Sequence, residues 1–341
     1  MTEQNTTSRL RDAMAAAFPS YSEWLDTFYG MAEYHLGWRD EYLQTRNGDA
    51  GKLIRPRLCL LGCQVVGGSE TRVLPLAAAI QLLHDHTLVH DDIQDGSDLR
   101  RGRPTVWRLW GVAHGISVGD ALCVLSHRAL FQMANAGVPA SLILTIERYF
   151  DDMLLHINEG QHLDLSFERR FDIDEDDYLA MIERKTAALI AASLYMGALV
   201  GGGNVATAEA LEDFGTFLGL TYQIQDDVLG IWGDPTQTGK PVADDLYDRK
   251  KSFPIVYALT HAGASDRSLL HSIYSQSEIG EREIELLLAI LERSDARRHT
   301  EELADHYSNM ALAALERVPE GDPAALAQLR ALAEGLVGRP A

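Results

Sequence analysis

The feature that most constrains the fold is a helical spacing of apolar residues along nearly the whole chain. Apolar side chains recur every three or four residues, which is the period of one helix face, and no stretch shows the alternation of a half-buried strand. The sequence therefore predicts long helices over residues 73–90, 118–134, 141–161, 178–200, 206–228 and 281–292. Several of these are apolar over most of their circumference, which indicates burial among other helices.

We predict an all-α fold, a single-domain helical bundle of residues 1–341 around a central active-site cavity. No linker or shift in composition divides the chain, and glycine- and proline-rich breaks such as residues 201–203 and 233–241 mark loops. Acidic residues 172–177 precede a helical run, where they favour the positive end of a helix. They predict a helix start.

The net charge of −20 argues against a nucleic-acid partner, because phosphate backbones need a basic surface. A diphosphate substrate needs only a local group of basic residues. Cys59, Cys63 and Cys123 cannot all pair and lie in apolar helical stretches, which indicates a reduced, cytoplasmic chain. The polar start lacks the apolar part of a secretory signal, and no run is long enough to span a membrane, so we expect no stable membrane insertion.

The first aspartate cluster ends an apolar helical run. Asp91 and Asp95, four residues apart, share one face of a helix, and Asp92 is rotated by about 100°. Two carboxylates so close repel each other unless a cation binds both, and Mg²⁺ prefers carboxylates, water and substrate phosphate. A solvated acidic helix end is the alternative, but the apolar residues just before the cluster favour a magnesium site.

A second cluster, Asp226 and Asp227, ends another apolar run, with Gly230 where a third aspartate could stand. Asp226 is the better metal-ligand candidate. The basic run of residues 100–105 follows the first cluster, and arginine suits a planar partner with several oxygens, such as diphosphate. The chemistry indicated is metal-assisted departure of diphosphate, since fixed cations stabilise the charge that develops on the leaving oxygens.

In their order, these motifs resemble those of the trans-isoprenyl diphosphate synthases, the polyprenyl synthetase family, short-chain type. The matching segments are residues 51–56, 84, 88–95, 100–105, 160–164, 185–186, 222–227, 233–235, 238–240 and 250–251. The resemblance implies a prenyltransferase, a homodimer, that joins an allylic diphosphate to isopentenyl diphosphate head to tail. It also implies about three Mg²⁺ ions per active site, for which Mn²⁺ can substitute.

Residue roles follow from the same resemblance. Asp91, Asp95 and Asp226 would bind the metal and, with Arg100 and Lys185, form the catalytic set. The allylic diphosphate would be bound by Arg100, Lys185, Lys240 and Lys250, and isopentenyl diphosphate by Gly51, Lys52, Arg55, His84 and Arg101, with Thr186, Tyr222 and Gln223 lining the reacting centre. Lys251 could replace Lys250.

The resemblance also implies that the residues four and five positions before Asp91 set product length. These are Thr87 and His86. Phe or Tyr there stops growth early and Ala permits it. His86 is intermediate in size, so we expect a short- to medium-chain product, C20 geranylgeranyl diphosphate, with C15 or C25 and longer as alternatives.

Three other functions stay open. The pairs His84-Asp85 and His90-Asp91 fit a metallophosphohydrolase of the HD type, which leaves residues 100–105 unexplained. A terpene cyclase would have no use for the isopentenyl diphosphate set. A regulatory subunit without activity usually lacks one aspartate motif, and this chain has both.

Overall fold

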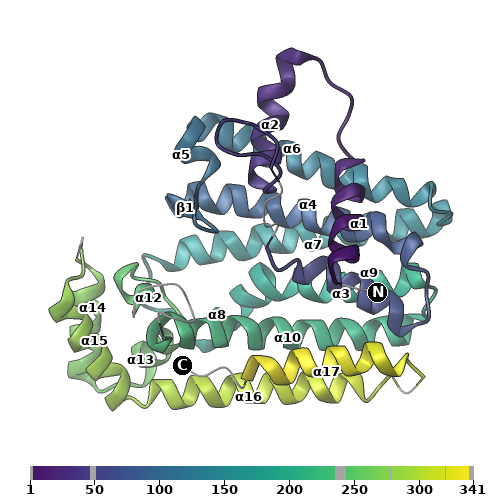
Figure 1. The fold of residues 1–341 in the computed structure, drawn as a ribbon. Helices are drawn as coiled ribbons and strands as arrows, with labels where there is room; N and C mark the ends of the chain where they lie inside the picture. Colours follow the sequence, from purple (N-terminus) through teal and green to yellow (C-terminus); the bar gives the residue numbers. More distant parts are fainter. Residues whose placement is uncertain (1–2, 47–50, 235–242, 277, 319, 338–341) are drawn as a thin grey trace. The chain divides into compact units, whose positions relative to one another are not determined.

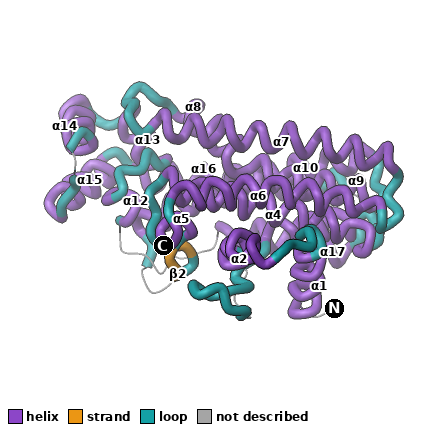
Figure 2. Tube along the Cα trace, turned by 90° about the horizontal axis from the view of Figure 1, so that it is seen from above, coloured by secondary structure: helices purple, strands orange, loops and turns teal. Residues whose placement is uncertain are grey.

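The computed structural model describes residues 3–46, 51–234, 243–276, 278–318 and 320–337. Within these residues most of the chain is helical, and the two strands form one short hairpin (Figure 2). The predicted all-α class is confirmed. None of the described helices combines the length and the apolar character needed to cross a membrane.

The elements are labelled in Figure 1, whose colours run along the chain. The first half contains α1 (Glu3–Ala15), η1 (Glu23–Leu25), α2 (Asp26–His35), α3 (Ile54–Val65), α4 (Glu70–Gln94), β1 (Leu99–Arg100), β2 (Arg103–Pro104), α5 (Val106–Trp110), α6 (Val112–Phe131), η2 (Gln132–Ala134) and α7 (Ala140–Phe167). The second half contains α8 (Glu175–Ile182), η3 (Glu183–Ala187), α9 (Ala188–Gly201), α10 (Val205–Trp232), α12 (Asp244–Tyr247), α13 (Phe253–His261), α14 (Ala264–Tyr274), α15 (Glu281–Arg293), α16 (Ala296–Leu315) and α17 (Pro323–Val337).

Two compact units can be distinguished, and the first consists of Met1–Tyr149 and Ser193–Asn204. Its central helix is α4, which packs against α1, α3 and α6. Every residue from 76 to 83 is buried, because helices cover α4 on several sides. This packing fixes the C-terminal end of α4, where the first aspartate cluster lies.

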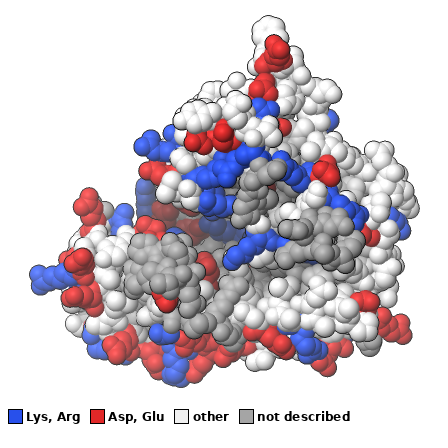
Figure 3. All heavy atoms as spheres, in the orientation of Figure 1, with Lys and Arg blue, Asp and Glu red and all other residues white. Residues whose placement is uncertain are grey.

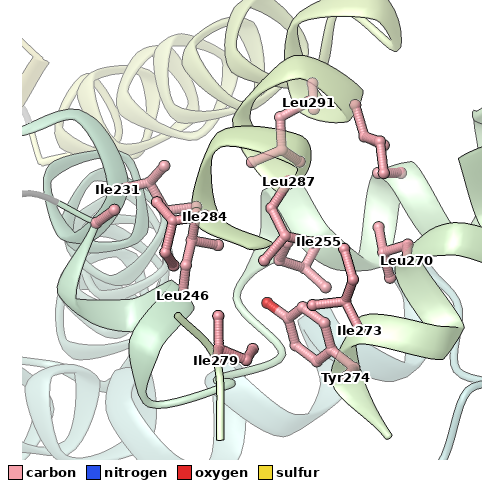
Figure 4. Packing of buried hydrophobic residues seen from close by; sticks show 14 of the residues in the cluster. Ile231, Leu246, Ile255, Leu270, Ile273, Tyr274, Ile279, Ile284, Leu287 and Leu291 are labelled. Atoms are coloured by element: carbon pink, nitrogen blue, oxygen red, sulfur yellow. The ribbon is translucent and has the colours of Figure 1, made fainter. Parts of the chain in front are cut away.

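The second unit consists of Phe150–Ala192 and Val205–Ala341. In it α16 packs against both α10 and α17, and the three helices run side by side (Figure 1). Figure 4 shows a further core in which Ile231 of α10 packs near Leu246, Ile255 and Leu287. That core anchors the end of α10, close to the second aspartate cluster. The single domain over residues 1–341 stays a prediction.

The region of residues 172–201 differs from its prediction in one respect. The acidic run does start a helix. The Asp174 carboxylate accepts from the Asp177 N–H at 2.9 Å, and the Asp177 carboxylate accepts from the Asp174 N–H, which together form a capping box. The predicted continuous helix over residues 178–200 is interrupted, however, by the π-helical turn η3. Such turns are rare and are frequent at functional sites.

Candidate active site

The first aspartate motif lies where α4 ends. Asp91 and Asp92 belong to its last turn, and Asp95 is the C-cap residue, whose N–H donates to the Asp91 carbonyl oxygen at 2.8 Å. Asp92 is buried, Asp91 is half-buried and Asp95 is exposed. Asp91 and Asp95 are therefore accessible to a metal from solvent, and Asp92 is not.

Asp92 is the buried partner of Arg100. The guanidinium Nε donates to Asp92 Oδ1 at 2.8 Å, and Nη2 lies 2.6 Å from the same oxygen. Burial raises the pKa of Asp92, and the positive charge of Arg100 opposes that rise. Arg100 is the predicted diphosphate ligand, and Asp92, for which the sequence predicts no role, is the group that holds it.

The hairpin of β1 and β2 presents the two consecutive arginines. Arg100 pairs with Arg103 across the hairpin, and Arg101 and Gly102 form the turn with φ values of +53° and +71°. Positive φ at both turn residues is typical of type I′ hairpins. The Arg103 guanidinium donates to the Tyr34 carbonyl oxygen at 3.0 Å and lies 3.8 Å from the centroid of its ring, which fixes the hairpin to α2.

Four of the five residues assigned to isopentenyl diphosphate form two contacting pairs. Arg55 Nη1 lies 3.1 Å from His84 Nε2, and because a guanidinium only donates, this imidazole nitrogen accepts. Burial and the charge of Arg55 accordingly lower the pKa of His84 well below its usual value. A side-chain carbon on Gly51 would lie 3.0 Å from the Arg101 guanidinium. The fifth residue, Lys52, is exposed just before α3.

A pocket of about 170 Å³ opens beside the hairpin. It is lined by Tyr34, His35, Arg46, Arg100, Arg101, Arg103, Pro104, Thr105 and Val106. Figure 3 shows Lys and Arg side chains gathered over the region of α2 and β1. Four arginines around one pocket favour an anion with several oxygens, such as a diphosphate.

The second aspartate motif lies near the end of α10. Asp226 is exposed, whereas Asp227 is buried and accepts from the Tyr178 hydroxyl, the Phe253 N–H at 2.7 Å and Gln223 Nε2 at 3.1 Å. Burial raises the pKa of Asp227 to about 7, against the effect of these donors. Asp226 stays the candidate metal ligand, and Asp227 joins α8, α10 and α13.

The π-helical turn brings Lys185 and Thr186 into a polar network. Lys185 Nζ donates to the carboxylate of Asp164 on α7, and Thr186 Oγ1 donates to Gln223 Oε1 at 3.0 Å. Since the amide nitrogen of Gln223 donates to Asp227, both ends of this amide are held. Three predicted residues thus lie together, with Asp164 as a partner that had no assigned role. Tyr222, also predicted to line the reacting centre, is half-buried on α10.

Gly230 leaves room for a carboxylate from another element. A side-chain carbon at this position would lie 2.1 Å from Oδ2 of Asp245 on α12, so no larger residue fits without displacing Asp245. The other oxygen of Asp245 lies 3.1 Å from Lys250 Nζ. Burial lowers the pKa of Lys250, but Asp245, together with Asp248 and Asp226, raises it, so the net pKa lies above the usual value and the lysine is kept charged.

Lys251 has a different environment from Lys250. It is buried, and its Nζ donates to the carbonyl oxygens of Phe167, Glu168 and Arg170 at the end of α7. A cation is favourable at a helix C-terminus. Lys250 therefore stays the candidate for diphosphate binding. Lys240, the other such candidate, lies outside the described residues.

Both candidates for control of product length lie on α4. His86 is buried, and its Nδ1 lies 2.9 Å from the carbonyl oxygen of Gly119 on α6. Its ring meets that of His90 edge-on, with 4.6 Å between centroids. Thr87 Oγ1 donates to the His84 carbonyl oxygen within the helix. The orientation of the His86 imidazole is therefore fixed against α6.

The residues assigned to the metal fit Mg²⁺ by donor type. Asp91, Asp95 and Asp226 offer accessible carboxylate oxygens, which this hard cation prefers. The first two belong to the first unit and Asp226 to the second. Their meeting at one cavity stays a prediction.

The polyprenyl synthetase family model matches residues 38–291. The (2E,6E)-farnesyl diphosphate synthase of Mycobacterium tuberculosis is 36% identical over 314 residues, 91% of this chain and 86% of that protein. The geranylgeranyl diphosphate synthase of the same organism is 38% identical over 300 residues, 88% of this chain and 85% of that one. The crystal structure of a polyprenyl synthetase from Streptomyces coelicolor is similar with a TM-score of 0.88, at 33% identity and with 98% of each chain covered. The chain belongs to the polyprenyl synthetase family and is a prenyltransferase.

Proposed function

We propose that the enzyme condenses an allylic diphosphate with isopentenyl diphosphate, head to tail and with Mg²⁺, to an all-trans polyprenyl diphosphate. The observation that carries this proposal is an arginine-lined pocket connected to an accessible aspartate pair. Arg100 lines the pocket and is bound to Asp92, the neighbour of Asp91. Cations that bind phosphate oxygens thus lie next to carboxylates suited to a metal.

In the proposed reaction the allylic carbon–oxygen bond breaks, and its electron pair leaves with the diphosphate. Mg²⁺, held by Asp91, Asp95 and Asp226, would act as a Lewis acid on the leaving oxygens. Lys185 and Lys250 would add fixed positive charge, because Asp164 and Asp245 hold them in place before substrate binds. Lys240 is proposed for the same diphosphate.

The double bond of isopentenyl diphosphate then attacks the allylic cation, and loss of a proton restores a double bond. Arg55 and Arg101 would hold this substrate by its diphosphate, together with Gly51, Lys52 and His84. Arg55 is oriented by its contact with His84, and Arg101 by the hairpin turn. This arrangement fixes the second substrate without using the metal.

We propose C20 geranylgeranyl diphosphate as the product. The fixed orientation of His86 supports a wall that does not move aside, and His86 is smaller than the Phe that stops growth early. Relatives named for C15 and C20 products agree with this range.

We further propose a homodimer in the cytoplasm, with no stable membrane insertion. The α6 residues Ile116, Val124 and Phe131 are large, apolar and about half-exposed, as expected for a surface that another subunit covers. The cysteines Cys59 and Cys63 are free thiols, as expected in a reducing compartment. Sedimentation velocity should show a dimer at micromolar concentration, and a monomer there would contradict this assembly.

The function is tested by incubating the enzyme with Mg²⁺, isopentenyl diphosphate and each of dimethylallyl, geranyl and farnesyl diphosphate. Products are then sized by mass spectrometry. The proposal predicts chain growth to C20 that EDTA abolishes. Release of phosphate or cyclic hydrocarbon without incorporation of isopentenyl diphosphate would contradict it.

A further inference from the structure

Asp85 is a buried aspartate with no role in the mechanism above. It lies on α4 and is only 1% exposed. Its Oδ2 accepts from Gln81 Nε2 at 2.8 Å. Its Oδ1 lies 3.3 Å from His35 Nε2, but neither of these two atoms has a hydrogen bond within the described part of the chain. An ionisable group is rarely buried without a compensating charge, so a nearby cation is to be expected.

That cation is Arg101. Its Nη2 lies 3.7 Å from Asp85 Oδ1, on which the His35 imidazole also converges. Asp85 and Asp92 are seven positions apart, so both lie on one face of α4. The two consecutive arginines of the hairpin are thus matched to two buried aspartates, Arg100 to Asp92 and Arg101 to Asp85.

Arg101 benefits from such a partner more than most surface arginines. Its backbone adopts the left-handed conformation of the turn, and its side chain, which lines the pocket, is 31% exposed. A long flexible side chain loses rotamer freedom when it binds a ligand. A buried carboxylate behind the guanidinium restricts that freedom in advance and lowers the entropy lost on binding.

We propose that Asp85, supported by His35, is a positioning residue that orients the Arg101 guanidinium for a diphosphate group in the pocket. His35 and Arg101 both line the pocket, and Asp85 lies behind them within contact distance of each. The identity of this diphosphate as isopentenyl diphosphate rests on the proposed function. Binding of a diphosphate group in the pocket can be measured without any reaction, so the role of Asp85 can be tested separately from the proposed function.

The test begins with Asp85→Asn, which keeps the shape and removes the charge. Binding of inorganic diphosphate is measured by calorimetry with EDTA present, so that metal-dependent binding does not contribute. We expect Kd to rise about tenfold, and KM for isopentenyl diphosphate to rise equally, with kcat and the allylic KM within about twofold. Asp98→Asn, which changes an exposed aspartate paired with Arg108, is the matched control and should alter none of these values.

The double variant Asp85→Asn with Arg101→Ala distinguishes an effect through the orientation of Arg101 from a general effect of lost charge or lost folding. Asp85→Asn should weaken binding no further when Arg101→Ala is already present, because the two act through one guanidinium. Equal weakening in both backgrounds, or tighter binding by Asp85→Asn alone, would overturn the proposal. If Asp85→Asn does not fold, His35→Gln replaces it and should raise Kd by a smaller factor; an unchanged Kd would overturn the proposal too. A wild-type enzyme that binds diphosphate but elongates no substrate would contradict the proposed function alone.

Discussion

At the scale of single residues, neighbouring aspartates have opposite environments. Asp91 and Asp226 are accessible, while Asp92 and Asp227, one position later, are buried with hydrogen-bond donors around them. A consecutive pair at a helix end cannot place both side chains on one face, since successive residues differ by about 100°. One member of each pair is thus available to the metal, and the other holds the surrounding elements.

This difference predicts how Asp91→Ala behaves. It should lower kcat by roughly three orders of magnitude, because it removes a ligand of the metal that neutralises the leaving diphosphate. The free energy of unfolding should change by less than about 1 kcal/mol, because the side chain is only half-buried. Steady-state kinetics and urea unfolding measure the two quantities. Near-normal turnover would refute the metal assignment, and Asp120→Ala, an exposed aspartate on α6, is the control.

At the scale of elements, Asp227 holds three helices together. The carboxylate of Asp227, on α10, accepts hydrogen bonds from the Tyr178 hydroxyl of α8 and from the Phe253 N–H at the start of α13. The same carboxylate orients Gln223, which in turn contacts Thr186 of the π-helical turn. The reacting groups of this unit therefore depend on one buried side chain.

The raised pKa of Asp227 predicts a pH-dependent stability. Its pKa is about 7 when folded against 3.8 for the ordinary carboxyl, so the folded state keeps a proton that the unfolded chain releases. Stability from this group is present at low pH and is lost as pH rises through about 7. The stability of wild type relative to Asp227→Asn should therefore fall between pH 5 and pH 8, by urea unfolding. A difference independent of pH would contradict this, and Asp226→Asn controls for the loss of one charge from the same turn.

The packing of α4 on α6 leads to a prediction for product length. His86→Ala removes the imidazole held by the Gly119 carbonyl oxygen and should shift the product toward C25 and longer. His86→Phe should shift it toward C15, because the wall becomes larger. Product sizing by mass spectrometry measures both, with His114→Ala on the exposed side of α6 as control. An unchanged distribution in both variants would place the wall elsewhere.

The sequence predicts those parts of the site whose residues are close together along the chain, and it does not predict those formed by residues far apart in the sequence. Asp91, Asp95 and Arg100 follow from motif spacing, because their relation is set within one helix end and one turn. The hairpin could not be predicted from the sequence, since two-residue strands are too short to show periodicity. The π-helical turn and Asp245 beside Gly230 arise from packing between distant segments, which local patterns do not contain.

At the scale of the whole molecule, the proposed reaction needs residues from both compact units. The first contributes Asp91, Asp95 and the arginine hairpin, and the second contributes Asp226, Lys185 and Lys250. A single diphosphate that is bound by both groups would make substrate binding depend on both. That one diphosphate is bound by both groups is the prediction on which the proposed function depends most.

The most direct test is magnesium-dependent binding of an unreactive allylic analogue, geranyl thiolodiphosphate, to the wild type and to Asp91→Asn and Asp226→Asn. Calorimetry gives Kd for each protein at fixed Mg²⁺. We predict that each substitution raises Kd at least about thirtyfold, because each removes a ligand for metal on the same diphosphate. Wild-type affinity in either variant would contradict the claim that the two aspartate motifs serve one site.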